Sequence, residues 1–217
     1  VIEELDPFIE EQIKALGIAV TGKDKLPICG ELTPGRFKEG LFGVPTPTED
    51  NSAELPQRPP NMCPGCPHRG VFMELNRAKA YVTGDIGCYT LGFMPPLSAM
   101  DTCVCMGASI GNATGISKVL SEEEQRKVVA VIGDSTFLHT GINGLMDMAY
   151  NQSSATLVIL DNRITAMTGR QENPTSGYTL AEQETYRVDI EQLCRAVGVK
   201  HVQVIDPYNI ALTRKTL

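Results

Sequence analysis

Two polar side chains end two neighbouring apolar runs of the sequence, and together they could bind a hard cation. The run VVAVIG is followed by Asp134, and the run ATLVIL is followed by Asp161 and Asn162. Because the carboxyl ends of parallel strands meet at one edge of a sheet, we expect the Asp134 carboxylate and the Asn162 amide oxygen to emerge there together. Such oxygens are ligands that Mg²⁺ accepts, usually alongside substrate phosphates.

The segment GDST (133–136) adds a possible anion site beside this cation site. It leads into a segment with helical character, and free N–H groups at the start of a helix bind phosphate. The spacing therefore fits a cradle for Mg²⁺ and a diphosphate. Asp and Asn are also common helix caps and turn residues, so the spacing alone leaves both interpretations open.

The elements around these residues alternate between strands and helices. Their strands are apolar throughout, which is typical of parallel strands that helices cover on both faces. We therefore predict an α/β fold with a doubly wound parallel sheet. The apolar patterns predict strands at 80–83, 128–132, 156–160 and 201–204, helices at 68–77, 109–120, 141–150 and 189–197, a last helix from about 207, and loops at 86–108 and 163–180.

The first 60 residues have a different composition. Residues 4–17 predict an amphipathic helix with Asp6 as its N-cap, and we assign residues 1–20 to the end of a preceding domain. Seven prolines lie between positions 27 and 60, so residues 21–60 are predicted to form an extended linker.

The main domain is predicted to cover residues 61–217, with its boundary near Arg58–Asn61. The chain begins at Val1 and ends in NIALTRKTL without a closing loop pattern. We therefore expect a piece of a longer protein, with the last domain cut short.

Charge and composition exclude several classes of function. The formal net charge of −7 argues against a nucleic-acid partner, which requires a basic face. No apolar run approaches the roughly 20 residues that a membrane helix needs. Residues 1–17 lack the basic start of a signal peptide. We therefore predict a cytoplasmic protein without a membrane or nucleic-acid partner.

Five of the seven cysteines lie between positions 63 and 105. Cys63-Pro-Gly-Cys66 has metal-ligand or redox spacing, and with Cys103-Val-Cys105 it could form a four-thiolate metal site. This pattern supports an alternative from another class, a cysteine-rich interaction scaffold that binds a metal. The favoured interpretation is a glycine-containing turn with buried thiols. Nearby, His68 is expected to cap or contact its own loop.

Four segments resemble those of the 2-oxoacid:ferredoxin oxidoreductase family. GDS…LDN resembles the thiamine diphosphate motif, and Asn162 follows Asp134 by 28 residues. The segment AMTGRQ is similar to the GMTGGQ of the family, and CPGCPHRG and GDIGCYTLG resemble two further loops. The resemblance covers about residues 58–205. Within the family it is closest to alpha subunits that act on arylpyruvates such as indolepyruvate.

The resemblance implies thiamine diphosphate and Mg²⁺ as cofactors and assigns roles to individual residues. Asp134 and Asn162 would bind Mg²⁺ through their side chains, and Ile164 through its backbone carbonyl. The diphosphate would contact Gly133, Ser135 and Thr136. Ser135 stands where a glycine is commoner, and Arg170 replaces a glycine of TGGQ.

Other residues would surround the rest of the cofactor, again as the resemblance implies. The loop from Cys63 to Cys66 would close beside it, and Met167 would pack under its bent form. The thiazolium end would be lined by Asp85, Gly87 and Cys88. The glutamate that activates the cofactor is expected outside this chain, so no catalytic residue is predicted within it.

The implied reaction is oxidative decarboxylation of a 2-oxoacid to an acyl-CoA, with coenzyme A as co-substrate and ferredoxin as electron acceptor. Iron–sulfur [4Fe–4S] clusters are expected in another part of the protein, a beta subunit as a partner, and an oligomer as the assembly. The segment alone is expected to be inactive. A second enzyme hypothesis is a non-oxidative thiamine diphosphate decarboxylase or synthase, which shares GDG…N but lacks CPGCPHRG and MTGRQ.

Overall fold

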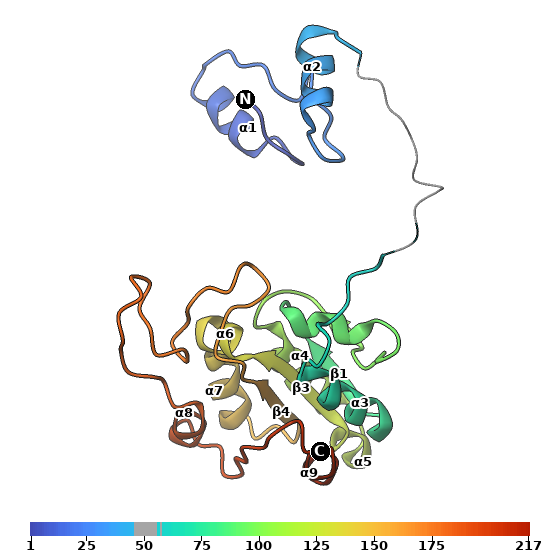
Figure 1. The fold of residues 1–217 in the computed structure, drawn as a ribbon, viewed down its shortest axis with the longest axis vertical. Coiled ribbons are helices and arrows are strands. Elements are labelled where there is room, and N and C mark those ends of the chain that lie inside the picture. Colours follow the sequence, from blue (N-terminus) through green and yellow to red (C-terminus); the bar gives the residue numbers. More distant parts are fainter. Residues whose placement is uncertain (46–55, 57) are drawn as a thin grey trace. The chain divides into compact units, whose positions relative to one another are not determined.

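The computed structural model describes residues 1–45, 56 and 58–217. They form two compact units that divide between Arg58 and Pro59, beside the boundary that the sequence suggests (Figure 1). The described residues of the first unit form two helices, and the second unit contains the sheet. Among the described residues, no helix combines the length and the apolar character that crossing a membrane requires.

The first helix, α1 (Phe8–Ala15), is shorter than predicted and begins differently. Its N-cap is Pro7, and Asp6 does not cap it through its side chain. Instead the Glu3 carboxylate accepts hydrogen bonds from the N–H groups of Ile9 and Glu10 at 2.8 and 2.9 Å. An acid from the preceding loop thus satisfies the donors that a helix start leaves free.

A second helix, α2 (Pro34–Phe42), lies inside the segment that was predicted to be an extended linker. That prediction is wrong for these residues. The Thr33 side chain caps the helix by accepting from Arg36 N, Pro34 occupies the first turn, and Gly43 ends the helix at φ +66°. A proline at this position stabilises a helix start, so its presence does not indicate a linker. Positions 46–55 and 57 of the predicted linker lie outside the described residues.

The second unit is built on four parallel strands, β1 (Tyr81–Gly84), β2 (Thr102–Cys103), β3 (Val128–Gly133) and β4 (Thr156–Leu160). The spatial order is β2-β1-β3-β4, and every neighbouring pair is parallel. This confirms the predicted α/β fold. Strand β3 is paired along its whole length. Tyr81 of β1 lies opposite its first residue, and Leu160 of β4 lies opposite its last.

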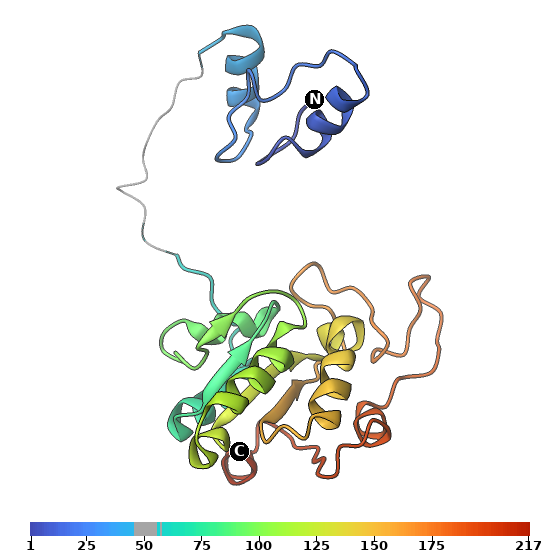
Figure 2. The same cartoon turned by 180° about the vertical axis from the view of Figure 1, so that it is seen from behind.

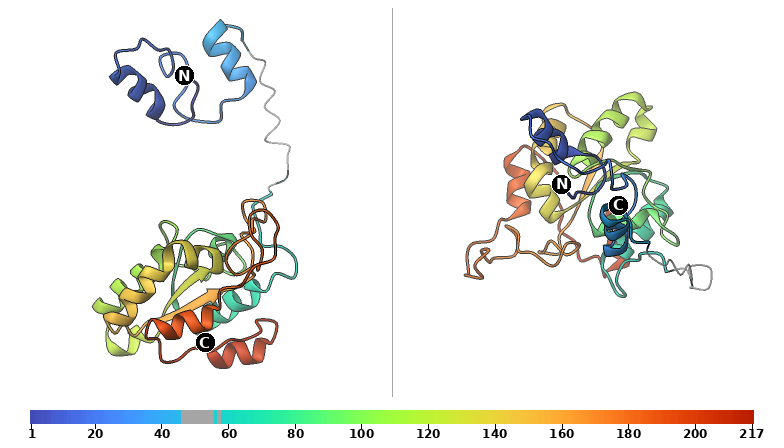
Figure 3. Two further views of the ribbon diagram at one scale, coloured as in Figure 1. Left: turned by 90° about the vertical axis from the view of Figure 1, so that its left-hand side faces the viewer. Right: turned by 90° about the horizontal axis from the view of Figure 1, so that it is seen from above.

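Helices cover both faces of this sheet, as its apolar strands require. On one face, α3 (His68–Ala78) packs Phe72 and Leu75 against Val129 and Val131. On the other, α4 (Ala108–Val119) and α7 (Ile142–Tyr150) pack against Val128, Ala130 and Ile132. The two layers are visible from behind in Figure 2 and from the side in Figure 3. The remaining short elements are η2 (Cys88–Phe93), α5 (Glu122–Gln125), α6 (Asp134–Thr136), η3 (Phe137–Gly141), α8 (Ile190–Ala196) and α9 (Ile210–Thr216).

Two predicted regions differ from the structure. The strand expected at 201–204 does not form, and these residues have no regular structure. Val202 packs against the core, but Val204 is 76% exposed, so this segment is not enclosed on both sides as a buried parallel strand is. The loop expected at 86–108 contains the helix η2 and the short strand β2.

The strand order creates a switch point between β1 and β3. From β1 the chain moves outward to β2, and α4 then returns it across β1 to β3. The loops after β1 and β3 therefore leave the sheet edge in opposite directions. Open α/β sheets bind their ligands in the crevice at this position.

Candidate functional site

Asp85 follows β1 and ties its loop to the start of α4. The side chain is fully buried. Its Oδ2 accepts hydrogen bonds from the Ser109 hydroxyl at 2.8 Å, Gly107 N at 3.1 Å and Ser109 N at 3.4 Å. The Tyr89 hydroxyl donates to Oδ1. Burial raises the pKa of this carboxyl in spite of these donors. Both oxygens are thus committed to holding the β1 loop against α4.

Tyr89 joins the loop after β1 to the end of β3. A Cβ atom at Gly87 or Gly133 would lie 2.3 or 2.8 Å from the Cε1 atom of Tyr89, so the ring packs directly against both backbones. The Thr136 hydroxyl donates to the Ile86 carbonyl at 3.4 Å, and the Tyr89 hydroxyl oxygen, whose proton goes to Asp85, lies 3.2 Å from the same carbonyl oxygen. The predicted site segments 85–88 and 133–136 are thereby brought together at the switch point.

Asp134 begins the helical run after β3 and is only 2% exposed. Its Oδ2 accepts hydrogen bonds from Asn173 Nδ2 at 3.1 Å and from the Thr175 hydroxyl at 2.8 Å. Both donors come from the long loop after β4, which returns to the sheet edge. Among the described residues, no ion pair involves Asp134.

The other oxygen of Asp134 is left without a partner. Oδ1 accepts no hydrogen bond from the part of the chain that the structure describes. Within that part, the only fully buried side-chain oxygen or nitrogen without a partner is Oγ1 of Thr102. Oδ1 of Asp134 is therefore an unpartnered oxygen that is not completely enclosed by the described residues.

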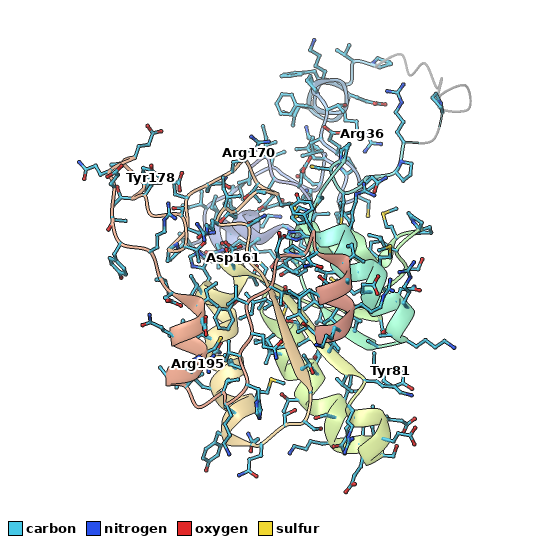
Figure 4. All side chains as sticks on the ribbon, turned by 60° about the horizontal axis from the view of Figure 1, so that its bottom comes forward. Arg36, Tyr81, Asp161, Arg170, Tyr178 and Arg195 are labelled. Atoms are coloured by element: carbon cyan, nitrogen blue, oxygen red, sulfur yellow. The ribbon has the colours of Figure 1, made fainter. Side chains whose placement is uncertain are left out.

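The loop after β4 also approaches the helix start. The Thr165 hydroxyl donates to Ser135 Oγ at 2.8 Å, which leaves the Ser135 proton free for another acceptor. Asn162 is exposed, and its Oδ1 accepts from Ile164 N at 3.2 Å. Met167 is 48% exposed. In Figure 4, Asp161 and Arg170 lie at the same end of the sheet, away from Tyr81 at the start of β1.

The charge of Asp134 affects the pKa of two nearby ionisable groups. Burial and the charge of Asp134 both raise the pKa of Asp161, so the two carboxyls interact. Burial lowers the pKa of His68, and the Asp134 charge partly opposes this. His68 was expected to serve its own loop, but the structure buries it to 6% exposure within the field of Asp134.

The cysteines do not assemble as the scaffold alternative requires. Within the described residues, no group of three or more His, Cys, Asp or Glu side chains is arranged to hold a metal ion. Cys66 N donates to the Cys63 carbonyl at 3.1 Å, which forms a turn before α3. The expectation of buried thiols in this turn is wrong, because Cys63 is exposed and Cys66 is half-buried. Burial and the neighbouring Cys66 and Cys63 raise the pKa of Cys88. Cys103 belongs to another contact, with its Sγ 3.6 Å from the Asp85 carbonyl oxygen.

Sequence reasoning did not identify Tyr89, Asn173 or Thr175. The Asp134 partners lie 39 and 41 positions away along the chain, and their pattern, Asn-Pro-Thr-Ser, reads locally only as a turn. The only sequence signal for these partners of Asp134 was a group of polar residues in the long loop that follows β4.

A comparison with known protein families identifies the class of enzyme to which this chain belongs. The chain belongs to the thiamine pyrophosphate enzymes: residues 85–216 match the family described as "Thiamine pyrophosphate enzyme, C-terminal TPP binding domain". The predicted relation to thiamine diphosphate is confirmed by this match.

Particular relatives narrow the class. The chain is 42% identical over 248 aligned positions to the indolepyruvate oxidoreductase subunit IorA of Pyrococcus horikoshii, and 40% identical over 230 positions to that of Archaeoglobus fulgidus. The matches cover 100% and 97% of this chain, but only 38% and 36% of those subunits.

One solved structure shares the fold. A 2-oxoglutarate:ferredoxin oxidoreductase from Magnetococcus marinus, with 2-oxoglutarate, coenzyme A and succinyl-CoA bound, superimposes with a TM-score of 0.56 at 21% identity. The match covers 74% of this chain and 60% of that one.

Proposed function

We propose that this chain is the part of an indolepyruvate-type 2-oxoacid:ferredoxin oxidoreductase that binds thiamine diphosphate through its diphosphate and Mg²⁺. The observation that carries the proposal is the state of Asp134. Its carboxylate lies at the switch point, and among the described residues it has no ion-pair partner and no hydrogen-bond donor to Oδ1. A buried carboxylate without a cationic partner is costly, and a bound divalent cation would compensate it.

The available donors fit Mg²⁺. Asp134 would supply Oδ1, Asn162 its amide oxygen and Ile164 its backbone carbonyl, and all three are oxygen atoms. The Asn162 oxygen already accepts one hydrogen bond from Ile164 N, but a carbonyl oxygen has a second lone pair for the cation. The nearby carboxyl of Asp161 adds negative charge to the same edge.

The start of the helical run after β3 fits a diphosphate. The first N–H groups of a helix have no partner within it, and they attract anions. The Ser135 hydroxyl keeps its proton because Thr165 donates to it, so it can also donate to a phosphate oxygen. We assign the diphosphate contacts to Gly133, Ser135 and Thr136.

We assign the other side of the cofactor to the loop after β1, with Asp85, Gly87 and Cys88. Asp85 would act there through position, since its oxygens are already satisfied. The turn from Cys63 to Cys66 and the exposed Met167 would complete the surroundings. When bound, thiamine diphosphate supplies a carbon nucleophile and an electron sink for the loss of carbon dioxide from a 2-oxoacid.

We propose arylpyruvates such as indolepyruvate as substrates, coenzyme A as acyl acceptor, ferredoxin as electron acceptor, and [4Fe–4S] clusters elsewhere in the protein. Two apolar side chains just after β1 and β2, Ile86 and Val104, are 38% and 66% exposed, which supports packing of a further domain or subunit there. We therefore also propose a beta-subunit partner and an oligomer. The seven free thiols support a reducing compartment, the cytoplasm.

Product analysis tests this function. The complete natural protein with its partner subunit is incubated with indolepyruvate, coenzyme A, ferredoxin, thiamine diphosphate and Mg²⁺. We expect an acyl-CoA and reduced ferredoxin, both lost in Asp134→Ala and kept in Asp147→Asn, which changes an exposed carboxylate of α7. An aldehyde formed without coenzyme A would favour the non-oxidative enzyme instead.

A further inference from the structure

The loop segment 173–176 is unusually buried for a polar sequence. Asn173, Thr175 and Ser176 are 5%, 3% and 8% exposed. The turn is closed by Ser176 N and the Ser176 hydroxyl, which both donate to the Asn173 carbonyl at 2.9 Å. The Pro174 carbonyl also accepts from Val188 N at 2.9 Å. The segment is thus fixed at both ends and held against the sheet edge.

Its polar side chains converge on one atom, Oδ2 of Asp134. Asn173 Nδ2 lies 3.1 Å and the Thr175 hydroxyl oxygen 2.8 Å from it. Thr175 also orients Asn173: its N–H donates to Asn173 Oδ1 at 2.8 Å, and its hydroxyl lies 2.6 Å from the same oxygen. Since the hydroxyl has a single proton, it serves Asp134 and Asn173 in turn.

Both donors to Oδ2 of Asp134 are uncharged groups. An amide and a hydroxyl are neutral, so they hold the carboxylate without cancelling its charge. A lysine or arginine in the same place would have satisfied a buried carboxylate more strongly and would have removed its attraction for a cation. The contacts also fall on one oxygen only, while Oδ1 accepts no hydrogen bond from the described residues.

We infer that Asn173 and Thr175 are positioning residues of the cation site, which fix the Asp134 carboxylate as a one-oxygen ligand with Oδ1 turned to the metal. This inference rests on the proposed function and extends it to a segment outside the recognised motif. Groups that orient a metal ligand change metal affinity by about 10- to 100-fold when they are removed.

The experiment measures Mg²⁺ binding, with thiamine diphosphate present in excess, by calorimetry on the complete natural protein. Thr175→Val keeps the shape and removes the hydroxyl, so we expect Mg²⁺ affinity about 10-fold lower. Thr175→Ser restores a donor and should stay within about threefold of the original protein, because the donor atom is retained. The matched control is Thr179→Val, whose hydroxyl accepts from Gln183 N in the same loop and does not touch Asp134.

A second readout separates positioning from general damage. At saturating Mg²⁺, the affinity for thiamine diphosphate and the turnover of Thr175→Val should approach those of the original protein. If Thr175→Val does not fold, Asn173→Ala takes its place; it removes the amide donor to Asp134 together with the Oδ1 atom that accepts from Thr175.

Three outcomes are informative. Weaker Mg²⁺ binding with rescue by Thr175→Ser supports the inference. Folded Thr175→Val or Asn173→Ala that binds Mg²⁺ as well as Thr179→Val overturns the inference and leaves the proposed function intact. Absence of Mg²⁺ and thiamine diphosphate binding by the unaltered protein overturns the proposed function and this inference with it.

Discussion

Asp85 and Asp134 are both buried and both follow a strand that borders the switch point, but their surroundings differ. Both oxygens of Asp85 are used, by the Tyr89 hydroxyl and by donors from the start of α4. Asp134 has neutral donors on one oxygen only. The first carboxyl is therefore a structural tie, and the second retains the capacity to bind a cation.

Removing the Tyr89 hydroxyl should weaken the tie at Asp85. We expect Tyr89→Phe to lower the free energy of unfolding by about 1–3 kcal/mol, because a buried acceptor loses a donor while the ring still fills its space. Urea unfolding measures this. Tyr178→Phe, in the exposed part of the long loop, is the control and should unfold like the original protein. Equal stability of the two variants would contradict the role of the hydroxyl.

His68 should make stability depend on pH. Its pKa is lowered by burial, so the unfolded chain takes up a proton first as the pH falls. The contribution of neutral, buried His68 to the free energy of unfolding is therefore complete above its ordinary pKa of 6.5. It is lost as the pH falls from there through the lower pKa of the folded state. Urea unfolding at several pH values between about 7.5 and 5 should show a smaller loss in His68→Gln than in the original protein. His201→Gln, at an exposed position, should keep the full pH dependence.

Strand-end residues of the site could be predicted because their signal is local. A glycine and an acid after a buried apolar run indicate a ligand-binding edge, and Gly133 and Asp134 follow that pattern. Asn173 could not be found in this way. Its importance depends on a partner 39 positions earlier, and only the folded loop brings the two together.

At the scale of elements, the turn into α4 is shaped by Gly107. Its N–H donates to Asp85, its φ is +84°, and an added Cβ would lie 2.5 Å from the Thr140 hydroxyl oxygen and 2.8 Å from the Thr140 carbonyl oxygen. The turn therefore packs closely against the last turn of η3. Both the backbone conformation and the space exclude a side chain here.

Gly107→Ala should be more harmful than the same change at Gly198, which has φ +102° but nothing within 4 Å of an added Cβ. For Gly198→Ala we expect only the strain of a left-handed residue, about 1–2 kcal/mol. For Gly107→Ala the contact with Thr140 adds to that strain, so the loss should be larger. Urea unfolding of both variants measures the difference. Equal losses in the free energy of unfolding would show that the turn can move to make room for the side chain.

The elements differ in how well the sequence specifies them. Strand β4 was predicted at its observed bounds, because a short apolar run rich in branched residues has few alternatives. The helix α2 was missed because prolines suggested a linker, although Thr33, Pro34 and Gly43 are also helix start and stop signals. Residues 201–204 have an alternating apolar pattern but form no strand, since pairing depends on neighbours that the pattern does not reveal.

At the scale of the whole second unit, the last helix is attached to α3 through Glu74. Its carboxylate is buried and accepts from Arg214 at 2.8 and 3.2 Å and from Arg77 at 2.9 Å. Arg214, followed by Arg77, holds the pKa of Glu74 below its ordinary value. An ion pair thus links residues that are 140 positions apart and closes the layer on that face of the sheet.

Glu74→Gln should loosen α9 and leave the sheet intact. Hydrogen exchange of the amides in 210–216 should become faster, while those of β3 should keep their protection. Arg77→Gln is the control, since it leaves the contact with Arg214 in place. Because the pKa of Glu74 is lowered in the folded state, its ion pairs stabilise the fold fully above the ordinary pKa of 4.5. This stabilisation is lost as the pH falls through the pKa of the folded state. Unchanged exchange in α9 would contradict this attachment.

The central claim is that Asp134 and its neighbours hold a diphosphate cofactor through a divalent cation. The most direct test is a calorimetric titration of the complete natural protein with thiamine diphosphate, with and without Mg²⁺, beside Asp134→Ala and the control Asp147→Asn. We predict binding that requires Mg²⁺, is lost in Asp134→Ala and is kept in Asp147→Asn. Binding that is equally tight without Mg²⁺, or that survives in Asp134→Ala, would contradict the account.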